Sequence, residues 1–181
     1  MKNNGKYIVG LIILILVLVF GAGIIIVNRS STARRIQVVY IPKARDDAND
    51  FWTSLLKGAQ MAANEYDVDL TILAPDSEQD FEAQVRYIDE AIAMNPNAII
   101  LSPSSKSEIT EAANRIVVAG IRLVLIDSEL DQNLQSIVVE TDNVAAGRKM
   151  GEFILTHLPE NPVIGVVSHV KSSSTAQERY Q

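Results

Sequence analysis

Four groups of polar and aromatic residues in this 181-residue sequence could take part in chemistry, because each comes after a short apolar segment. They are Asn49-Asp50-Phe51-Trp52, Ser102-Pro103-Ser104, Asp127-Ser128 and Thr141-Asp142-Asn143. Carboxylates accept hydrogen bonds, hydroxyls and amides both donate and accept them, and an aromatic ring presents a flat apolar face. These groups suit reversible binding of a small polar molecule, and no G-x-S-x-G segment supplies a nucleophile for covalent chemistry.

Other kinds of site lack the residues that they need. The sequence has no cysteine, and its two histidines, His157 and His169, lack the spacing of metal ligands. No G-x-G-x-x-G follows the first apolar segment and no G-x-x-x-x-G-K-[ST] occurs, so nucleotide binding has no support. Asp46, Asp47 and Asp50 lack the glycine and the terminal glutamate of a calcium loop. We therefore predict no metal site, no cofactor and no enzymatic activity.

Two adjacent aromatic residues, Phe51 and Trp52, open a predicted helix. Adjacent helical positions point about 100° apart, so both rings cannot face the core. We expect one ring, with Phe51 as a candidate because it begins the apolar stripe, to pack inward while the other points toward the strand ends. An aromatic face there would stack on the C–H surface of a sugar ring, and Asn49 beside it would hydrogen-bond to hydroxyl groups.

The acidic and hydroxyl candidates also have structural interpretations. Asp127 is either a turn or cap residue or an acceptor for two neighbouring sugar hydroxyls. Asp142 has the same alternatives, and its position before a predicted helix over 143–158 makes the N-cap the stronger one. Ser102 either contacts a ligand or shapes the turn before Pro103.

Two further signals concern helix boundaries and packing. Ser105 with Glu108 has the spacing of a capping box, which predicts the start of a helix, and Gly120 is expected to end that helix. The spacing of Gly147 and Gly151 is expected to let a helix approach the sheet closely.

Apolar segments and helical periodicity alternate along the chain after residue 35. Buried strands are predicted over 36–41, 68–73, 98–101, 121–126, 136–140 and 163–167. Helices are predicted over 51–66, 81–92, 109–117 and 144–158. A strand–helix–strand alternation requires right-handed crossovers, so we predict an α/β fold with a doubly wound parallel sheet. Such sheets bind ligands at the carboxyl ends of their strands, where the four polar groups lie.

The N-terminal segment is apolar rather than amphipathic. Ile8–Val27 is an almost unbroken apolar run, and about 20 helical residues span the roughly 30 Å of a bilayer core. A cleaved signal peptide has a shorter apolar region, and Ser31-Thr32-Ala33 makes a poor cleavage site. We predict one N-terminal transmembrane helix acting as a signal-anchor over 8–27, preceded by a segment over 1–7 and followed by a tether over 28–35. Lys2 and Lys6 before the run and Arg29, Arg34 and Arg35 after it leave its orientation open. That 1–7 is cytoplasmic is implied only by the family resemblance described below. A cleaved signal peptide is the alternative.

The rest of the chain is acidic. Lys2 and Lys6 are the only charged residues before Arg29, so the remainder holds 14 of the 16 basic residues and all 22 acidic ones, a formal charge of −8. An acidic surface repels phosphate backbones, so we expect no nucleic-acid partner.

Seven segments, in order and spacing, resemble the type I periplasmic binding proteins of the ribose and galactose class. They are Asn49-Asp50-Phe51-Trp52, GAQMAA from Gly58, Gln84 with YIDEAI from Tyr87, NAIILSP from Asn97, AGIRLVLIDS from Ala119, TDNVAAGRKMGE from Thr141 and QER from Gln177. The resemblance runs from about Ile36 to the last residue. It implies two α/β lobes joined by a three-strand hinge, with a sugar bound in the cleft between them.

The resemblance also implies which residues bind the ligand and how the chain divides. First-lobe ligands fall on Asn49, Phe51, Trp52, Ser102 and Asp127; Thr141 and Asp142 lie at the first hinge crossing, and Arg179 matches an arginine of the second lobe. The first lobe is expected over 36–141, and an incomplete start of the second lobe over 142–181. Asp50 stands where the family has a proline, so we expect a less rigid loop there.

These observations favour extracytoplasmic binding of a small polar solute, a sugar before other classes, for an ABC-type permease. The alternatives are a membrane-anchored sensing partner of a histidine kinase and a non-functional truncated remnant. The expected location is the cell membrane, by a single pass with the domain outside, or the periplasm or medium if the apolar run is cleaved.

Overall fold

The computed structural model describes residues 35–45, 49–159, 162–167 and 170–179. The chain divides into two compact units, Met1–Arg35 and Ile36–Gln181, and the fold described below is that of the second. The apolar run Ile8–Val27 lies outside the described residues, so the transmembrane helix and its alternative stay predictions. No helix within the described ranges combines the length and the apolar character needed to cross a membrane.

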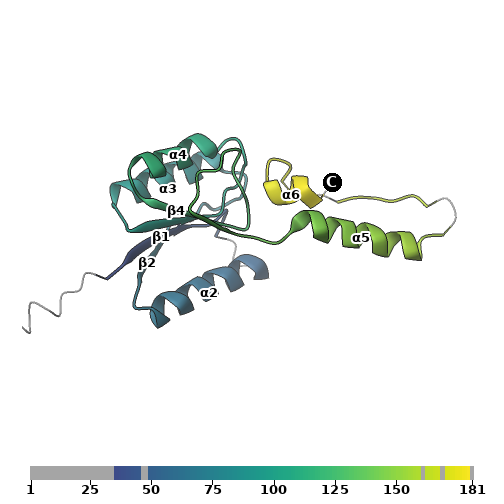
Figure 1. Cartoon of the computed structure of the whole chain (residues 1–181), viewed down its shortest axis with the longest axis horizontal. Coiled ribbons are helices and arrows are strands. Elements are labelled where there is room, and N and C mark those ends of the chain that lie inside the picture. Colours follow the sequence, from purple (N-terminus) through teal and green to yellow (C-terminus); the bar gives the residue numbers. More distant parts are fainter. Residues whose placement is uncertain (1–34, 46–48, 160–161, 168–169, 180–181) are drawn as a thin grey trace, which may run out of the picture. The chain divides into compact units, whose positions relative to one another are not determined.

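Five parallel strands form one sheet (Figure 1). They are β1 (Gln37–Ile41), β2 (Asp69–Ile72), β3 (Ala98–Leu101), β4 (Arg122–Ile126) and β5 (Ile137–Val139). Their spatial order is β2-β1-β3-β4-β5, and every neighbouring pair is parallel. The chain runs from β1 outward to β2 and then returns to the far side of β1, so its winding reverses between β1 and β3. The doubly wound parallel sheet predicted from the sequence is confirmed.

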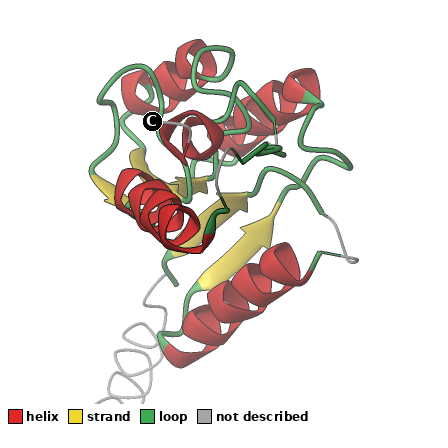
Figure 2. Ribbon diagram, turned by 90° about the vertical axis from the view of Figure 1, so that its right-hand side faces the viewer, coloured by secondary structure: helices red, strands yellow, loops and turns green. Residues whose placement is uncertain are grey.

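Helices lie on both faces of this sheet (Figures 1 and 2). One face carries α3 (Phe81–Ala93) and α4 (Thr110–Val118), and the other carries α2 (Asp50–Glu65). The main hydrophobic core contains strand and α3–α4 residues, among them Ile41, Leu101, Ile88 and Ile116, and no residue of α2. The core therefore lies between the sheet and the α3–α4 pair.

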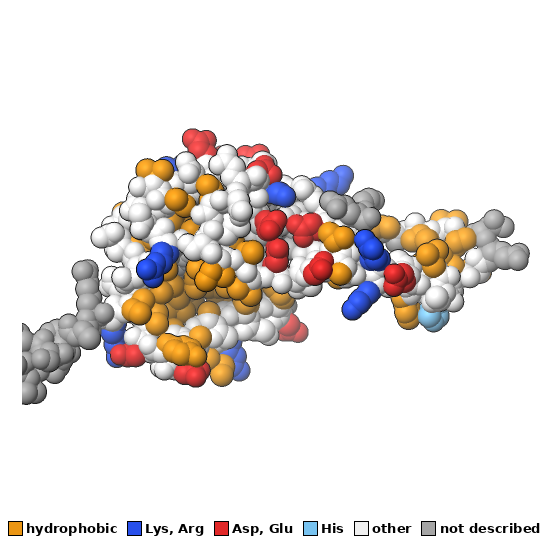
Figure 3. Space-filling model, in the orientation of Figure 1, with side chains coloured by type: hydrophobic (Ala, Val, Ile, Leu, Met, Phe, Trp, Pro, Cys, Tyr) orange, Lys and Arg blue, Asp and Glu red, His pale blue; other side chains and the backbone are white. Residues whose placement is uncertain are grey.

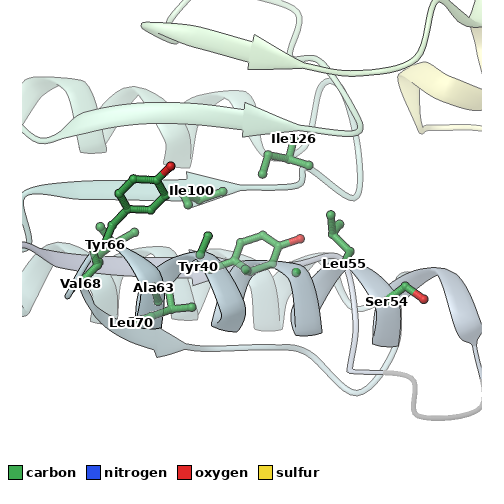
Figure 4. Close-up of a pocket in the computed structure, with 13 residues that line it drawn as sticks. Tyr40, Ser54, Leu55, Ala63, Tyr66, Val68, Leu70, Ile100 and Ile126 are labelled. Atoms are coloured by element: carbon green, nitrogen blue, oxygen red, sulfur yellow. The ribbon is translucent and has the colours of Figure 1, made fainter.

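The contact between α2 and the sheet is looser. Within α2 only Trp52 and Ala63 are buried. An apolar cavity of about 500 Å³ lies between the helix and the sheet, lined among others by Tyr40, Ile100 and Leu55 (Figure 4). Figure 3 shows apolar side chains gathered in a hollow between these two elements. This cavity contains none of the predicted ligand residues.

The predicted boundaries of α4 are correct at one end only. Ser105 Oγ accepts the Glu108 N–H at 3.3 Å, as a capping box requires, but the helix proper begins at Thr110 after a turn. At the other end Gly120 has φ +76°, and Ile121 N–H donates to Ile116 O at 3.2 Å. This six-to-one bond past a left-handed residue is a Schellman cap, and it confirms the predicted role of the glycine.

The predicted sixth strand over 163–167 is wrong. These residues follow α5 (Asn143–His157) and form no regular structure, and Val163, Val166 and Val167 are 100%, 66% and 101% exposed. A strand needs a neighbour that accepts and donates its backbone hydrogen bonds. The sheet ends at β5, and no described strand lies beside 163–167. The last element, α6 (Ser174–Arg179), follows this irregular stretch.

Candidate functional site

The polar edge of the sheet is built from loops that follow β1, β3 and β4. Ser102 and Asp127 come directly after β3 and β4, and Lys43 is the second residue after β1. Lys43 Nζ lies 2.7 Å from Asp127 Oδ2, so the loops after β1 and β4 meet in an ion pair. Because the winding reverses between β1 and β3, this edge is the place where a doubly wound sheet leaves room for a ligand.

Asp127 is a turn residue whose carboxylate caps no helix. Its φ is +72°, in the left-handed region that residues other than glycine seldom adopt. Its N–H donates to Val139 O at 2.9 Å, and its Oδ2 accepts the Ser128 hydroxyl at 3.0 Å in addition to the Lys43 ammonium. Of the alternatives predicted for Asp127, the turn is present, and the role of the carboxylate as a ligand stays a prediction.

The aromatic pair divides as expected, one ring inward and one outward. Trp52 is the inward ring at 3% exposure, whereas Phe51 is 52% exposed, so the expectation that Phe51 packs into the core is wrong. The two rings meet edge to face with centroids 4.9 Å apart, and Trp52 Nε1 donates to Glu78 Oε1 at 2.6 Å. Asn49 is the N-cap of α2, because its Oδ1 accepts the Phe51 N–H at 3.0 Å. Phe51 is therefore the ring available for stacking.

Ser102 lies below the edge rather than on it. It is fully buried, and its hydroxyl is 3.1 Å from the Tyr40 hydroxyl. Burial raises the pKa of Tyr40 to about 12, although the hydrogen bond with Ser102 opposes that rise. Ser102 thus belongs to a buried hydroxyl pair, which favours the turn-shaping interpretation made from the sequence.

A buried glutamine fixes the loops after β1 and β3. Gln84 Nε2 donates to Pro42 O at 3.1 Å and to Ser102 O at 2.9 Å, and Gln84 Oε1 accepts the Ser104 N–H at 2.9 Å. Its side chain is fully buried. Three backbone groups of two loops therefore depend on one side chain of α3.

A second group of predicted residues gathers around Asn143 at the start of α5. Asp142 is the N-cap, accepting the Ala145 N–H at 2.9 Å, as the stronger alternative predicted. Asn143 Nδ2 donates to Thr141 O at 2.9 Å, and Asn143 Oδ1 accepts Arg179 Nε at 2.8 Å. The structure thus brings Thr141, Asp142 and Arg179 together through Asn143, which belongs to one of the four polar groups of the sequence but was not among the predicted ligand residues.

Close packing at Gly147 involves a helix and not the sheet. A Cβ atom at Gly147 would lie 2.8 Å from the backbone oxygen of Arg179 in α6. Gly151 has nothing within 4 Å of such an atom. The expectation of helix–sheet packing at these glycines is therefore wrong. Gly147 packs closely against the end of α6, and the space beside Gly151 is open.

A serine segment before α6 contacts the loops at the sheet edge. Ser173 Oγ accepts the Lys43 ammonium at 3.1 Å, Ser174 Oγ accepts the Glu129 N–H at 2.8 Å, and Ser172 O accepts the Lys106 N–H at 2.9 Å. These contacts connect the segment to the loops after β1, β3 and β4.

Carboxylates beyond Asp127 also lie near this edge. Burial raises the pKa of Glu140, and the charges of Glu129, Glu178 and Asp127 and a hydrogen bond with Glu129 raise it further. No group of acidic or histidine side chains in the described ranges has an arrangement that could hold a metal ion.

Comparison with known proteins identifies the family of this chain. A profile described as "Periplasmic binding protein domain" matches residues 38–181, most of the chain. The chain belongs to the periplasmic binding protein family.

Individual relatives agree with this assignment. The D-allose-binding periplasmic protein of Escherichia coli is 28% identical over 141 residues, covering 73% of this chain and 45% of that protein. The ribose import binding protein RbsB of Bacillus subtilis is 26% identical over 131 residues, covering 72% and 42%. The crystal structure of a sugar transporter from Clostridium phytofermentans is 40% identical with a TM-score of 0.79, covering 81% of this chain and 54% of that one. The chain thus spans about half the length of these relatives, which are binding and transport proteins and not enzymes.

In this periplasmic binding protein the eight predicted ligand residues fall into two neighbourhoods. Asn49, Phe51, Trp52, Ser102 and Asp127 lie at or below the sheet edge, and Thr141, Asp142 and Arg179 lie around Asn143. Their roles as ligands stay predictions.

Sequence reasoning missed Lys43, Gln84 as a loop anchor, and Ser173. The signal for Lys43 was a charge two residues after a buried strand, but nothing local indicated its partner.

Proposed function

We propose that this chain forms part of an extracytoplasmic binding protein whose solute is a sugar. The observation that carries the proposal is the row of contacts from the exposed Phe51 ring through Trp52 to the Lys43–Asp127 ion pair at the carboxyl edge of the sheet. A sugar ring has an apolar C–H face and a rim of hydroxyls, so an aromatic face beside charged hydrogen-bonding groups suits both parts of it. The names of the ribose and allose relatives support the same solute class.

A titration followed by backbone amide NMR tests this proposal, because it detects weak as well as tight binding. D-ribose and D-allose are added separately to the isotopically labelled chain. We expect saturable shifts at the amides of 49–52, 102, 127–128 and 141–143. Glycine betaine at equal concentration serves as the control for non-specific solvent effects. Shifts that fail to saturate, or that scatter over α3 and α4 as they do with betaine, would contradict sugar binding at this edge.

The partner that we propose is an ABC-type permease rather than a sensor kinase, since the B. subtilis relative is named as an import binding protein. Co-purification of the chain with an ABC-type permease from the cells that express both is the expected result. Recovery with a histidine kinase in its place would favour the sensing alternative.

We further propose that Ile8–Val27 anchors the protein in the cytoplasmic membrane with residues 36–181 outside. The support is the length of the apolar run. The expressed chain should sediment with membranes and be digested by protease added outside the cell. Release of a chain beginning near Ala33 or Arg34 would instead show a cleaved signal peptide.

A further inference from the structure

The buried Trp52 ring has one polar atom, and its partner lies in a loop that holds none of the predicted ligand residues. Trp52 Nε1 donates to Glu78 Oε1 at 2.6 Å, so a side chain from the loop after β2 reaches the first turn of α2. Trp52 is 3% exposed, and a buried indole N–H needs an acceptor. A backbone carbonyl would meet that need, but a carboxylate makes a charge-assisted hydrogen bond, which is shorter and about twice as strong.

Packing alone does not fix the beginning of α2. The helix buries only Trp52 and Ala63, and the apolar cavity of about 500 Å³ separates its middle from the sheet. Trp52 does not belong to the main hydrophobic core. An indole ring has a single hydrogen-bond donor, so the bond with Glu78 is the directional contact that sets its orientation.

The loop that carries Glu78 is held by its own backbone hydrogen bonds. Pro75 O accepts the Arg45 N–H at 2.7 Å, which joins this loop to the loop after β1. Asp80 N–H donates to Ser77 O at 3.1 Å and closes a turn around Glu78, and Asp80 is also the N-cap of α3. The carboxylate of Glu78 therefore extends from a fixed backbone.

The exposed Phe51 ring depends on the orientation of Trp52. The two ring planes meet at 80° with their centroids 4.9 Å apart, which is an edge-to-face contact. Phe51 is 52% exposed, so few other contacts hold its ring. A rotation of the indole ring would therefore move the apolar surface that is proposed to stack on a sugar.

We propose that Glu78 is a positioning residue of the sugar site. Its carboxylate fixes the indole ring of Trp52, and Trp52 in turn fixes the Phe51 ring against which the sugar stacks. The inference rests on the proposed sugar-binding function, and it extends the site to the loop after β2. In this arrangement Glu78 acts through Trp52 and makes no contact with the solute.

The NMR signal of the indole N–H observes this hydrogen bond directly. Trp52 is the only tryptophan in the sequence, so the full chain in a mild detergent gives one such signal. E78Q keeps the length of the side chain and a neutral acceptor but removes the charge. We expect the indole proton of E78Q to resonate upfield of its wild-type position and to exchange faster with water, because the hydrogen bond is weaker. E90Q, at an exposed position of α3, is the matched control and should leave the signal in place.

Titration with D-ribose and with D-allose, followed by the backbone amides, measures the affinity of the same variants. E78Q should weaken binding by about fivefold, because a neutral hydrogen bond is about half as strong as a charge-assisted one. E90Q should bind as the wild type does. W52F has no indole N–H, so E78Q should weaken binding no further in a W52F protein. If E78Q does not fold, E78D takes its place, since it keeps the charge but shortens the reach of the carboxylate, and it should weaken binding in the same way.

The outcomes distinguish this inference from the proposed function. Saturable amide shifts with wild-type affinity in the Glu78 variant would overturn the role of Glu78 and leave sugar binding intact, even if that variant lowers the urea midpoint. An unmoved indole signal, or an equal loss of affinity from E78Q in the wild type and in W52F, would also overturn it, because Glu78 would then not act through Trp52. If neither sugar gives saturable shifts with the wild-type chain, the proposed function fails, and this inference fails with it.

Discussion

Replacing Gln84 by leucine should destabilise the protein far more than an ordinary polar-to-apolar change. The two side chains have similar volume, so the substitution leaves little cavity. It does remove the partners of three backbone groups, the carbonyls of Pro42 and Ser102 and the N–H of Ser104, at a side chain that is 0% exposed. A buried polar group left without a hydrogen bond costs about 1–3 kcal/mol. Three such groups give a loss of at least about 3 kcal/mol, a large part of the roughly 5–15 kcal/mol that stabilises a typical domain.

Urea unfolding followed by tryptophan fluorescence measures this loss directly, because Trp52 is the only tryptophan and is buried. With a urea dependence of about 1–3 kcal/mol per molar, the midpoint should fall by at least about 1 M. Gln60→Leu is the matched control, since Gln60 lies exposed on α2. Its midpoint should change little. Equal midpoints for Gln84→Leu and the wild type would refute the conclusion that Gln84 holds the loops after β1 and β3.

Three further predictions concern the other parts of the site. Gly147→Ala should lower the urea midpoint and speed amide exchange in α6, because the new Cβ would lie 2.8 Å from the Arg179 backbone oxygen. Gly151→Ala has nothing within 4 Å of the new Cβ and should raise the midpoint, because a glycine inside a helix costs about 1 kcal/mol relative to alanine. Equal effects of the two substitutions would contradict the close packing at Gly147. The pKa of Glu140 is raised in the folded state, so the stability contributed by the protonated carboxyl is present at acidic pH and is lost as the pH rises through that pKa. Glu140→Gln should therefore flatten the pH dependence of the unfolding midpoint between mildly acidic and neutral pH. An unchanged pH profile in this variant would count against the effect. Phe51→Ala should weaken sugar binding by about fivefold, corresponding to about 1 kcal/mol, and should cost little stability because Phe51 is 52% exposed. The measurement is calorimetry on a chimera in which this chain is joined to the C-terminal half of one of its relatives. Unchanged affinity would show that Phe51 does not contact the sugar.

The sequence was sufficient for most of the sheet because a buried parallel strand is a local feature. Each of the five observed strands is an apolar segment that falls within a predicted range, as with β3 over Ala98–Leu101. The segment 163–167 has the same apolar character and still forms no strand. Strand formation also needs a neighbour in register, and the sequence of a segment does not contain that information.

The sequence was sufficient to select residues at the carboxyl edge of the sheet, but not to say which of them pair with one another. Strand order and crossovers place ligand residues at the carboxyl edge, so Asp127 could be selected from its position alone. Its partner Lys43 could not, because a salt bridge between two distant loops leaves no periodic trace in the sequence. The same holds for Asn143 and Arg179, whose hydrogen bond joins residues of two different helices. Which of Phe51 and Trp52 is buried depends on which side of α2 faces the sheet. The apolar stripe of α2 consists largely of alanines, and such a stripe defines the buried side of a helix only weakly.

Two sets of contacts from outside the edge fix its geometry. Gln84 of α3 holds the loops after β1 and β3 from within the core, and Ser172–Ser174 hold the loops after β1, β3 and β4 from the side of α6. Lys43 takes part in the second set while also standing beside Asp127. A solute that engages Lys43 therefore acts on the contact between the first loop and the Ser173 segment. If the solute contacts Lys43, substitution of Ser173 by alanine should alter sugar affinity without removing any group that touches the sugar. The same substitution should leave the affinity unchanged in a protein in which Lys43 is replaced by glutamine. If the changes in binding free energy caused by the two substitutions simply add in the double variant, the serine segment and the solute are not coupled through Lys43.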